Sequence, residues 1–128
     1  MPRDLADICQ AGARAIAGDE REAITTAAHA CGYVVVELGG ALSEASLLGL
    51  LADELAFPPW FTHDWQGLVD VLADVSWSAV AGHVIVIAGE MADADRAVLA
   101  EIVDVAARIR AQAGVALWCL FVTRRPGS

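Results

Sequence analysis

Apolar residues in this chain form three short runs, separated by longer segments with helical periodicity. The runs cover residues 33–38, 83–88 and 115–122, and each is preceded by a glycine. Runs of this length, rich in β-branched residues and next to turn residues, are typical of buried β-strands. The third run is apolar at every position, which indicates a strand with both faces covered. We therefore expect it to lie in the middle of a parallel sheet.

The segments between the runs predict helices. A first helix is expected over residues 19–31, because carboxylates occupy its first turn and Gly32 follows its end. Ser43 can cap a second helix, and residues 64–74 fit a short third one. The buried stripe of the second helix is marked by leucines at helical spacing: Leu47, Leu48, Leu51 and Leu55.

A fourth, longer helix is expected before the last strand. Asp93 or Asp95 can cap it, and it runs to about Gln112, where Gly114 stops it. Its predicted buried stripe consists of β-branched residues three or four positions apart: Val98, Ile102, Val105 and Ile109.

Strands that alternate with helices require crossover connections, which place parallel strands side by side. We therefore predict an α/β fold, with a small three-stranded parallel sheet packed with three or four helices. Residues 1–18 show little hydrophobic periodicity. We accordingly divide the chain into a loosely attached N-terminal arm with a short helix (1–32), one folded domain (33–123) and a disordered tail (124–128).

Acidic residues are concentrated in the central part of the chain. The formal net charge is −9, and residues 22–95 contain 11 acidic residues but no Arg or Lys. Proteins that bind nucleic acid directly concentrate cations on the contact face, so we do not expect direct nucleic-acid binding. An anionic surface favours a cationic protein partner. The alternative is that these charges only keep an alanine-rich chain soluble.

The sequence carries no signal for membrane insertion, export or disulfide bonding. Its longest apolar run has eight residues, against the ~20 that a membrane-spanning helix needs. Asp4 and Asp7 occupy positions where a signal peptide would have its apolar core. Three cysteines, an odd number without CxxC spacing, do not indicate a disulfide framework. We expect a cytoplasmic protein.

Residues with catalytic or metal-binding chemistry are scattered along the chain. A zinc site needs three or four converging ligands, which the three histidines and three cysteines do not provide at any recognisable spacing. His63 and Asp64 are adjacent, but no Ser or Cys nucleophile accompanies them in a recognisable turn. We therefore expect no metal, no cofactor and no enzymatic activity. A small α/β enzyme is the less favoured alternative.

Residues 58–74 place apolar and polar side chains on opposite faces of a helix. At 100° per residue, the apolar stripe consists of Phe61, Trp65, Leu68, Val69 and Leu72. The opposite face consists of His63, Gln66, Gly67, Asp70 and Asp74. Glycine inside an exposed helix costs about 1 kcal/mol relative to alanine, so we expect a partner to approach the backbone at Gly67. The alternative is a solvated helix face with a tolerated glycine.

The same segment resembles the signature of the barstar family, the intracellular inhibitors of barnase-type ribonucleases. Residues 55–58 (Leu-Ala-Phe-Pro) match the end of the preceding helix, and Trp60 and Phe61 match an aromatic pair. Asp70 matches the second of two family aspartates. The expected order of strands and helices also agrees with the family over residues 33–122.

The resemblance implies how such a protein works. In the family, the loop and the helix that follows it occlude the ribonuclease active site, and the aspartate matched by Asp70 lies where a substrate phosphate would bind. The family also uses an acidic residue from a later helix, for which Glu101 and Asp104 are the candidates. The chain departs from the family at four positions: Thr62 (Gly in the family), Asp64 (Asn), Gln66 (the first Asp) and Gly67 (Ala).

The resemblance therefore implies an inhibitor that forms a 1:1 complex with a basic, intracellularly toxic ribonuclease or related toxin. It implies no contact with nucleic acid or membrane. The partner-binding residues are expected to be Trp60, Phe61, Thr62, His63, Asp64, Gln66, Gly67, Asp70 and Asp74. An immunity module for another basic toxin or protein is the first alternative.

Overall fold

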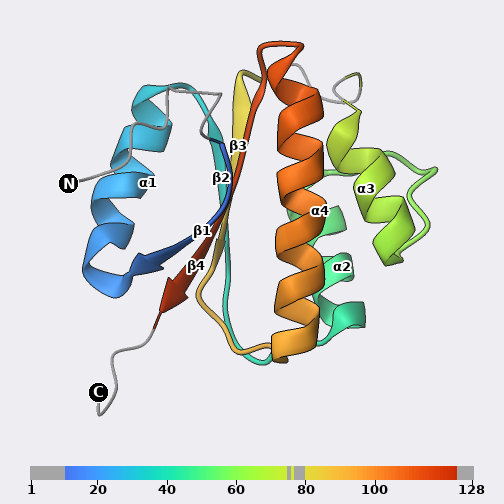
Figure 1. Cartoon of the computed structure of the whole chain (residues 1–128), viewed down its shortest axis with the longest axis horizontal. Helices are drawn as coiled ribbons and strands as arrows, with labels where there is room; N and C mark the ends of the chain where they lie inside the picture. The colour runs from blue at the N-terminus through green and yellow to red at the C-terminus, as the bar shows by residue number, and fades with distance from the viewer. Residues whose placement is uncertain (1–10, 75, 77–79, 124–128) are drawn as a thin grey trace.

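The computed structural model describes residues 11–74, 76 and 80–123 of the chain. Their centre is a sheet of parallel strands in the order β1-β4-β3-β2 (Figure 1). The strands are β1 (Gly12–Ala17), β2 (Val34–Leu38), β3 (Gly82–Ile87) and β4 (Ala116–Thr123). The helices are α1 (Arg21–Ala30), α2 (Glu44–Leu55), α3 (Trp65–Ala73) and α4 (Asp93–Ala111), and a 3-10 turn over Gly18–Glu20 precedes α1.

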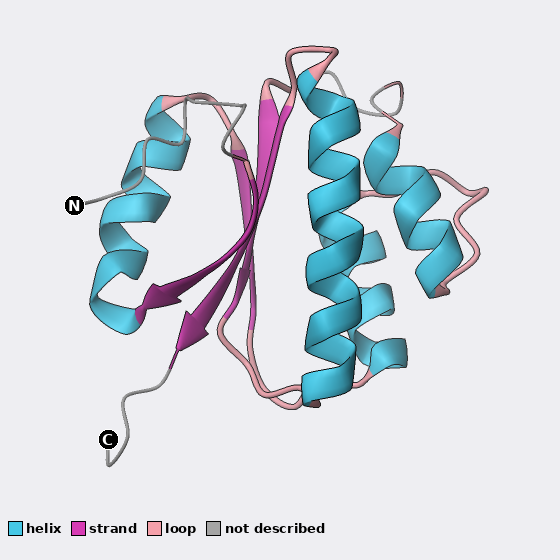
Figure 2. Ribbon diagram, viewed as in Figure 1, coloured by secondary structure: helices cyan, strands magenta, loops and turns pink. Residues whose placement is uncertain are grey.

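The helices form two layers, one on each face of the sheet. Helix α1 covers one face, and α2, α3 and α4 cover the other (Figures 1 and 2). Strands β1 and β2, which are joined through α1, lie at opposite edges of the sheet. Helix α3 packs against α4. The segment with the family signature is therefore held on the layer opposite α1.

The α/β class and the parallel sheet are confirmed, but the predicted number of three strands is wrong. The fourth strand is β1, in a segment that we expected to be a loosely attached arm. All six residues of β1 pair with β4. Ile16 of β1 is only 2% exposed and packs in the apolar cluster under α1. This part of the expected arm therefore belongs to the folded core.

Side chains satisfy backbone groups of the edge strand β1 that β4 does not reach. The N–H of Ala13 donates to Asp104 Oδ1 at 2.7 Å, and the N–H of Ala17 donates to Glu20 Oε1 at 2.9 Å. The guanidinium of Arg14 donates to the carbonyl oxygen of Ala13 at 2.7 Å. Unpaired edge groups are templates for pairing with another chain. These three contacts protect β1 from such pairing.

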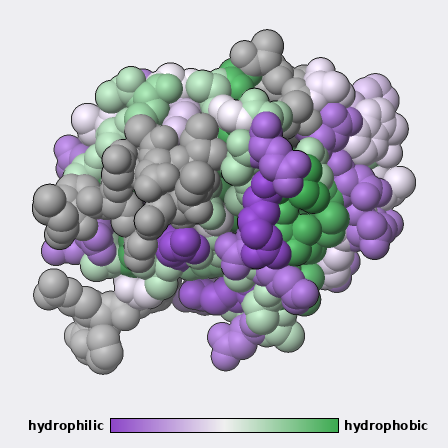
Figure 3. All heavy atoms as spheres, turned by 45° about the horizontal axis from the view of Figure 1, so that its top comes forward, coloured by the Kyte–Doolittle hydropathy of each residue, from purple (hydrophilic) through white to green (hydrophobic). Residues whose placement is uncertain are grey.

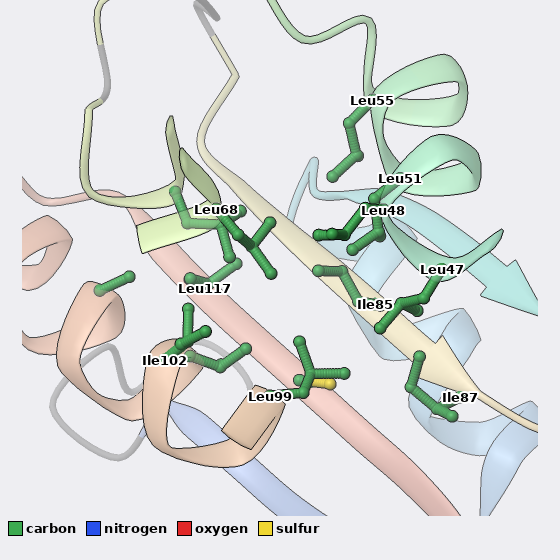
Figure 4. Packing of buried hydrophobic residues seen from close by; sticks show 14 of the residues in the cluster. Leu47, Leu48, Leu51, Leu55, Leu68, Ile85, Ile87, Leu99, Ile102 and Leu117 are labelled. Atoms are coloured by element: carbon green, nitrogen blue, oxygen red, sulfur yellow. The ribbon is translucent and has the colours of Figure 1, made fainter. Parts of the chain in front are cut away.

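Strand β4 lies between β1 and β3, which confirms the interior position predicted from its unbroken apolar run. Its side chains alternate between two apolar clusters, one on each face of the sheet. Leu117, Cys119 and Phe121 belong to the larger cluster under α2, α3 and α4, and Ala116, Trp118 and Leu120 to the smaller one under α1. Figure 4 shows the larger cluster, in which leucines of α2 and α3 meet β3, β4 and α4.

One helix cap is as predicted and another is not. Ser43 caps α2, since its hydroxyl accepts a hydrogen bond from the N–H of Ser46 at 3.2 Å. For α4, neither Asp93 nor Asp95 is the cap. The N-cap residue is Ala92, which has no side chain that can accept a hydrogen bond. Both aspartates lie instead in the first turn, where negative charge interacts favourably with the helix dipole.

The buried stripe of α4 is also not the predicted one. Of the four predicted residues, only Ile102 is buried, while Val98 and Val105 are half-buried and Ile109 is 46% exposed. The buried positions are Leu99, Ile102, Val103, Ala106, Ala107 and Arg110. The buried face is thus shifted by about one position from the predicted stripe, and it includes two alanines and one arginine.

The remaining predictions about organisation are not decided by the fold. The tail over residues 124–128, predicted to be disordered, lies outside the described residues. The division of the chain between residues 32 and 33 stays a prediction. Within the described part of the chain, no helix is long and apolar enough to cross a membrane.

Candidate functional site

The candidate site begins with the loop that joins α2 to α3. Two of its residues have left-handed backbone conformations, Ala56 with φ 53° and His63 with φ 57°. Ala56 ends α2, and its N–H and that of Phe57 both donate to the carbonyl oxygen of Ala52. Positive φ is unfavourable for residues with a Cβ atom. The surrounding contacts therefore hold this loop in a defined path.

The aromatic pair of the signature has one buried and one exposed member. Phe61 is 6% exposed, meets Phe57 edge to face with ring centroids 4.9 Å apart, and lies 4.7 Å from the ring of His63. Trp60 is 47% exposed. Phe61 therefore anchors the loop to the core, and Trp60 is the aromatic side chain that a partner can reach.

Three of the four departures from the family pattern contact one another. The hydroxyl of Thr62 donates to Asp64 Oδ1 at 2.9 Å, and the N–H of Gly67 donates to the same oxygen at 2.6 Å. Asp64 is thus the N-cap of α3. These hydrogen bonds, with that from Gly67 the stronger cause, lower the pKa of Asp64, so the cap is ionised at neutral pH.

Gly67 is buried, contrary to our expectation that it lies on the exposed face of the helix. A Cβ atom at this position would overlap the hydroxyl of Thr62 and lie 3.0 Å from Asp64 Oδ1. The glycine is therefore explained by contacts inside the chain. No partner is needed to account for it.

Helix α3 presents a polar face to solvent, as the sequence predicted. Gln66 and Asp70 are exposed, and Asp74 is half-buried at the C-terminal end of the helix. The hydroxyl and the N–H of Ser76 lower the pKa of Asp74, and Arg110 adds to this effect. The buried face consists of Gly67, Leu68, Val71 and Leu72, while Trp65 and Val69 are partly buried at its margin.

The predicted site residues thus divide into two groups. The exposed ones are Trp60, Thr62, His63, Asp64, Gln66 and Asp70, and Asp74 is partly exposed. Phe61 and Gly67 are buried and support the loop from below. In Figure 3, hydrophilic residues border a hydrophobic area on the side of the molecule where α3 and α4 lie. Three of the site residues that are at least partly exposed are acidic: Asp64, Asp70 and Asp74.

The two candidates for a later acidic contact lie in different environments. Asp104 accepts the hydrogen bond from Ala13 of β1, so it is engaged in holding the edge strand. Glu101 is exposed on α4. Asp104 therefore has a structural role that its position in the sequence did not indicate.

A buried polar pair behind α3 was missed in the sequence. Arg110 of α4 donates from Nη1 to Nδ1 of His83 on β3 at 2.9 Å, and both residues are less than 4% exposed. Burial, with the charge of Arg110 second, lowers the pKa of His83 to about 4. Burial also lowers the pKa of Arg110 to about 10, against the opposing effect of Asp74. Arg110 thus links α4 to the sheet and, through charge, to the end of α3.

The spacing of the α4 residues contained a signal for this pair. Arg110 follows Leu99, Val103 and Ala106 at intervals of four, three and four residues, which places it on the buried face. A charged side chain on such a face requires a polar partner.

The described cysteines, Cys31 and Cys119, lie outside the loop and α3. Among the residues that the structure describes, no three His, Cys, Asp or Glu side chains converge as metal ligands would. Cys31 and Cys119 are free, and burial raises the pKa of the Cys119 thiol far above its ordinary value. The geometry instead provides an acidic helix, a braced loop and an exposed tryptophan.

A comparison with protein families identifies this arrangement. The family model described as Barstar (barnase inhibitor) matches residues 32–122, which include the loop, α3 and α4. The chain belongs to the barstar family. The match leaves out β1 and α1, which precede residue 32. Searches of curated proteins and of solved structures found no match. The barstar family is one of inhibitors, and its model covers the segment that carries the sequence signature.

Proposed function

We propose that this chain is a protein inhibitor that forms a 1:1 complex with a basic ribonuclease and occludes its active site. The observation that carries the proposal is the position of Asp70, exposed on a helix whose opposite face is buried in the core. A carboxylate held in this way can take the place of a substrate phosphate. No reaction is catalysed, because the inhibitor acts by substrate mimicry.

The braced loop supports this proposal. Thr62, Asp64 and Gly67 differ from the family residues, yet they form one hydrogen-bonded unit at the start of α3. Phe61 ties the same loop to the core. A preformed binding surface loses little conformational entropy when it binds. The departures are therefore compatible with the binding mode that the family implies.

Charge supports the choice of partner. Residues 22–95 carry 11 acidic side chains and no Arg or Lys, and the loop and α3 lie within this segment. Opposite net charges steer association and raise its rate. A basic, intracellularly toxic ribonuclease is thus the partner class that fits, and the inhibitor would protect the cytoplasm in which both proteins are made.

Gln66 favours a second candidate function. The family has an aspartate at this position, and glutamine keeps the hydrogen-bonding capacity but loses one charge. This difference is expected if the partner is another basic toxin, with fewer cations at the matching place. The chain would then be an immunity module of the same fold and with the same binding face.

Inhibition of a barnase-type ribonuclease tests the proposal. We expect RNA hydrolysis to fall linearly with added inhibitor until one equivalent is present, and a mononucleotide bound in the active site should compete with the inhibitor. The variant Gln66→Asp should bind this enzyme more tightly than the parent chain. Inhibition that is unaffected by the mononucleotide would contradict occlusion of the active site. An absence of inhibition by both the parent chain and Gln66→Asp would favour the other toxin class.

A further inference from the structure

A cavity of about 370 Å³ lies between the edge strand β1 and the first half of α4. None of its lining residues belongs to α3 or to the loop before it, so it is separate from the proposed inhibitory surface. Its walls are mainly apolar and consist of Ala13, Ala15, Ala97, Ala100 and Phe121. Its polar residues are Arg14, Asp93 and Arg96. The volume is within the range of small-molecule sites.

The guanidinium of Arg96 is the unusual group in this cavity. It lies over the ring of Phe121, with Cζ 5.3 Å from the ring centroid. Its Nε is shielded from solvent and has no hydrogen-bond partner among the described residues. Among the described residues, no carboxylate forms an ion pair with the Arg96 guanidinium. Arg96 as a whole is half-buried, but one shielded N–H without a partner is unfavourable, and a bound anion that reached it would satisfy it.

A second cavity, of about 320 Å³, shares Arg96 with the first one. It is lined by residues at the carboxyl ends of β3 and β4, including Met91 and Thr123. In open α/β sheets, ligands bind outside the carboxyl ends of strands, where connections leave toward opposite faces. Here β1 continues to α1 on one face and β3 continues to α4 on the other (Figure 1). Arg96 lies near the carboxyl ends of β3 and β4.

We propose that the cavity between β1 and α4 binds a small organic monocarboxylate with an apolar body. The carboxylate would pair with the planar donor fork of Arg96, and Arg14 would supply a second positive charge. The alanines and Phe121 would surround the apolar body. Arg14, Arg96 and Asp93 together give the cavity one net positive charge. One carboxylate neutralises this charge, whereas a phosphate monoester with two negative charges exceeds it.

Benzoate and its neutral analogue benzamide test this site, because they share an apolar ring and differ in charge. In isothermal titration with the full chain, we expect saturable binding of benzoate that is at least tenfold tighter than that of benzamide. Arg96→Met keeps the apolar stem over Phe121 and should remove this difference. The matched control is Arg108→Met, which removes an exposed charge from the same helix and should leave benzoate affinity within twofold of the parent value.

A second variant tests the cavity without removing any charge. Ala97→Leu should fill part of the space and weaken benzoate binding at least tenfold, and circular dichroism establishes that each variant is folded. Equal affinity for benzoate and benzamide would overturn the proposal. Unchanged benzoate binding in folded Arg96→Met, or in folded Ala97→Leu, would do the same.

Discussion

At the scale of single residues, the start of α3 depends on three side chains that act together. Thr62, Asp64 and Gly67 each differ from the family pattern, and each difference makes room for another or bonds to it. The hydroxyl of Thr62 occupies the space where a Cβ of residue 67 would lie, and Asp64 accepts hydrogen bonds from both neighbours. The three departures therefore compensate one another.

A double-mutant cycle tests this compensation. Gly67→Ala alone should destabilise the protein by about 1–3 kcal/mol, because the new methyl group overlaps the Thr62 hydroxyl. In the Thr62→Gly background, which restores the family residue, the same change should cost much less. We expect a coupling energy of about 0.5–3 kcal/mol from urea unfolding of the four proteins. Additive effects would show that the two positions are independent.

The buried His83 makes a separate residue-level contribution, which depends on pH. Its pKa is lowered to about 4 from an ordinary value of 6.5, so the unfolded chain binds the proton more strongly. The contribution of His83 to the free energy of unfolding is therefore fully present above about pH 6.5, and it is lost as the pH falls toward 4. The full loss is roughly 3 kcal/mol. Asp64 and Asp74, whose pKa values are lowered, contribute in a different window, below about pH 4.

Unfolding free energies measured between pH 7 and pH 4.5 test this prediction. The parent chain should lose stability steadily over this range. His83→Gln, which keeps a hydrogen-bond acceptor for Arg110 but does not titrate, should lose much less. Parallel curves for the two proteins would contradict a buried, neutral histidine.

At the scale of the elements, sequence patterns predicted those parts of the fold that depend on long or continuous apolar runs. The interior position of β4 was predicted because eight apolar residues in a row are typical of a strand that is buried on both faces. The strand order confirms it. Strand β1 was missed, since Ala13, Ala15 and Ala17 have weak β-propensity and its pairing with β4 is not visible locally. The stripe of α4 was misplaced because Arg110 is buried through its contact with His83.

The candidate site, too, was only partly predictable from the sequence. The exposed Asp70 and the burial of Leu68 and Leu72 follow from helical periodicity, whereas buried Val71 was not in the predicted stripe. The burial of Gly67 depends on Thr62, five residues earlier and outside the helix, so no periodic pattern contains it. The cavity beside Arg96 depends on β1 lying next to α4, which requires the complete sheet.

Removal of β1 tests its role as a structural element. A chain that begins at residue 19 loses buried Ile16 and all pairing along one edge of β4. We expect it to melt at least about 10 °C below a chain that begins at residue 11 and keeps the strand. Equal melting temperatures for the two truncated chains would show that β1 adds no stability, as expected if residues 1–32 are a loosely attached arm.

At the scale of the whole molecule, the two helical layers have different roles in this account. The layer with α2, α3 and α4 carries the proposed binding surface, and α1 covers the opposite face of the sheet (Figure 1). Because α3 is anchored by Leu68, Val71 and Leu72, charges on its outer face can be changed with little effect on folding. Binding and stability can therefore be tested separately.

Removal of the Asp70 carboxylate tests whether α3 contacts the ribonuclease. Asp70→Ala should leave stability within about 0.5 kcal/mol of the parent value, because the side chain is exposed. Affinity for the ribonuclease should fall by about 2–5 kcal/mol, mostly through faster dissociation. This range is borrowed from interfacial charge pairs that include those of the barnase–barstar complex itself. Glu22→Ala removes the same charge from the exposed surface of α1 and serves as the control.

The measurement is the dissociation constant of the three proteins with the ribonuclease at one fixed salt concentration, with unfolding curves for each. We expect weak binding for Asp70→Ala and nearly parental binding for Glu22→Ala, with all three proteins folded. If folded Asp70→Ala binds as tightly as the parent chain, α3 is not the contact surface and Asp70 does not mimic a substrate phosphate.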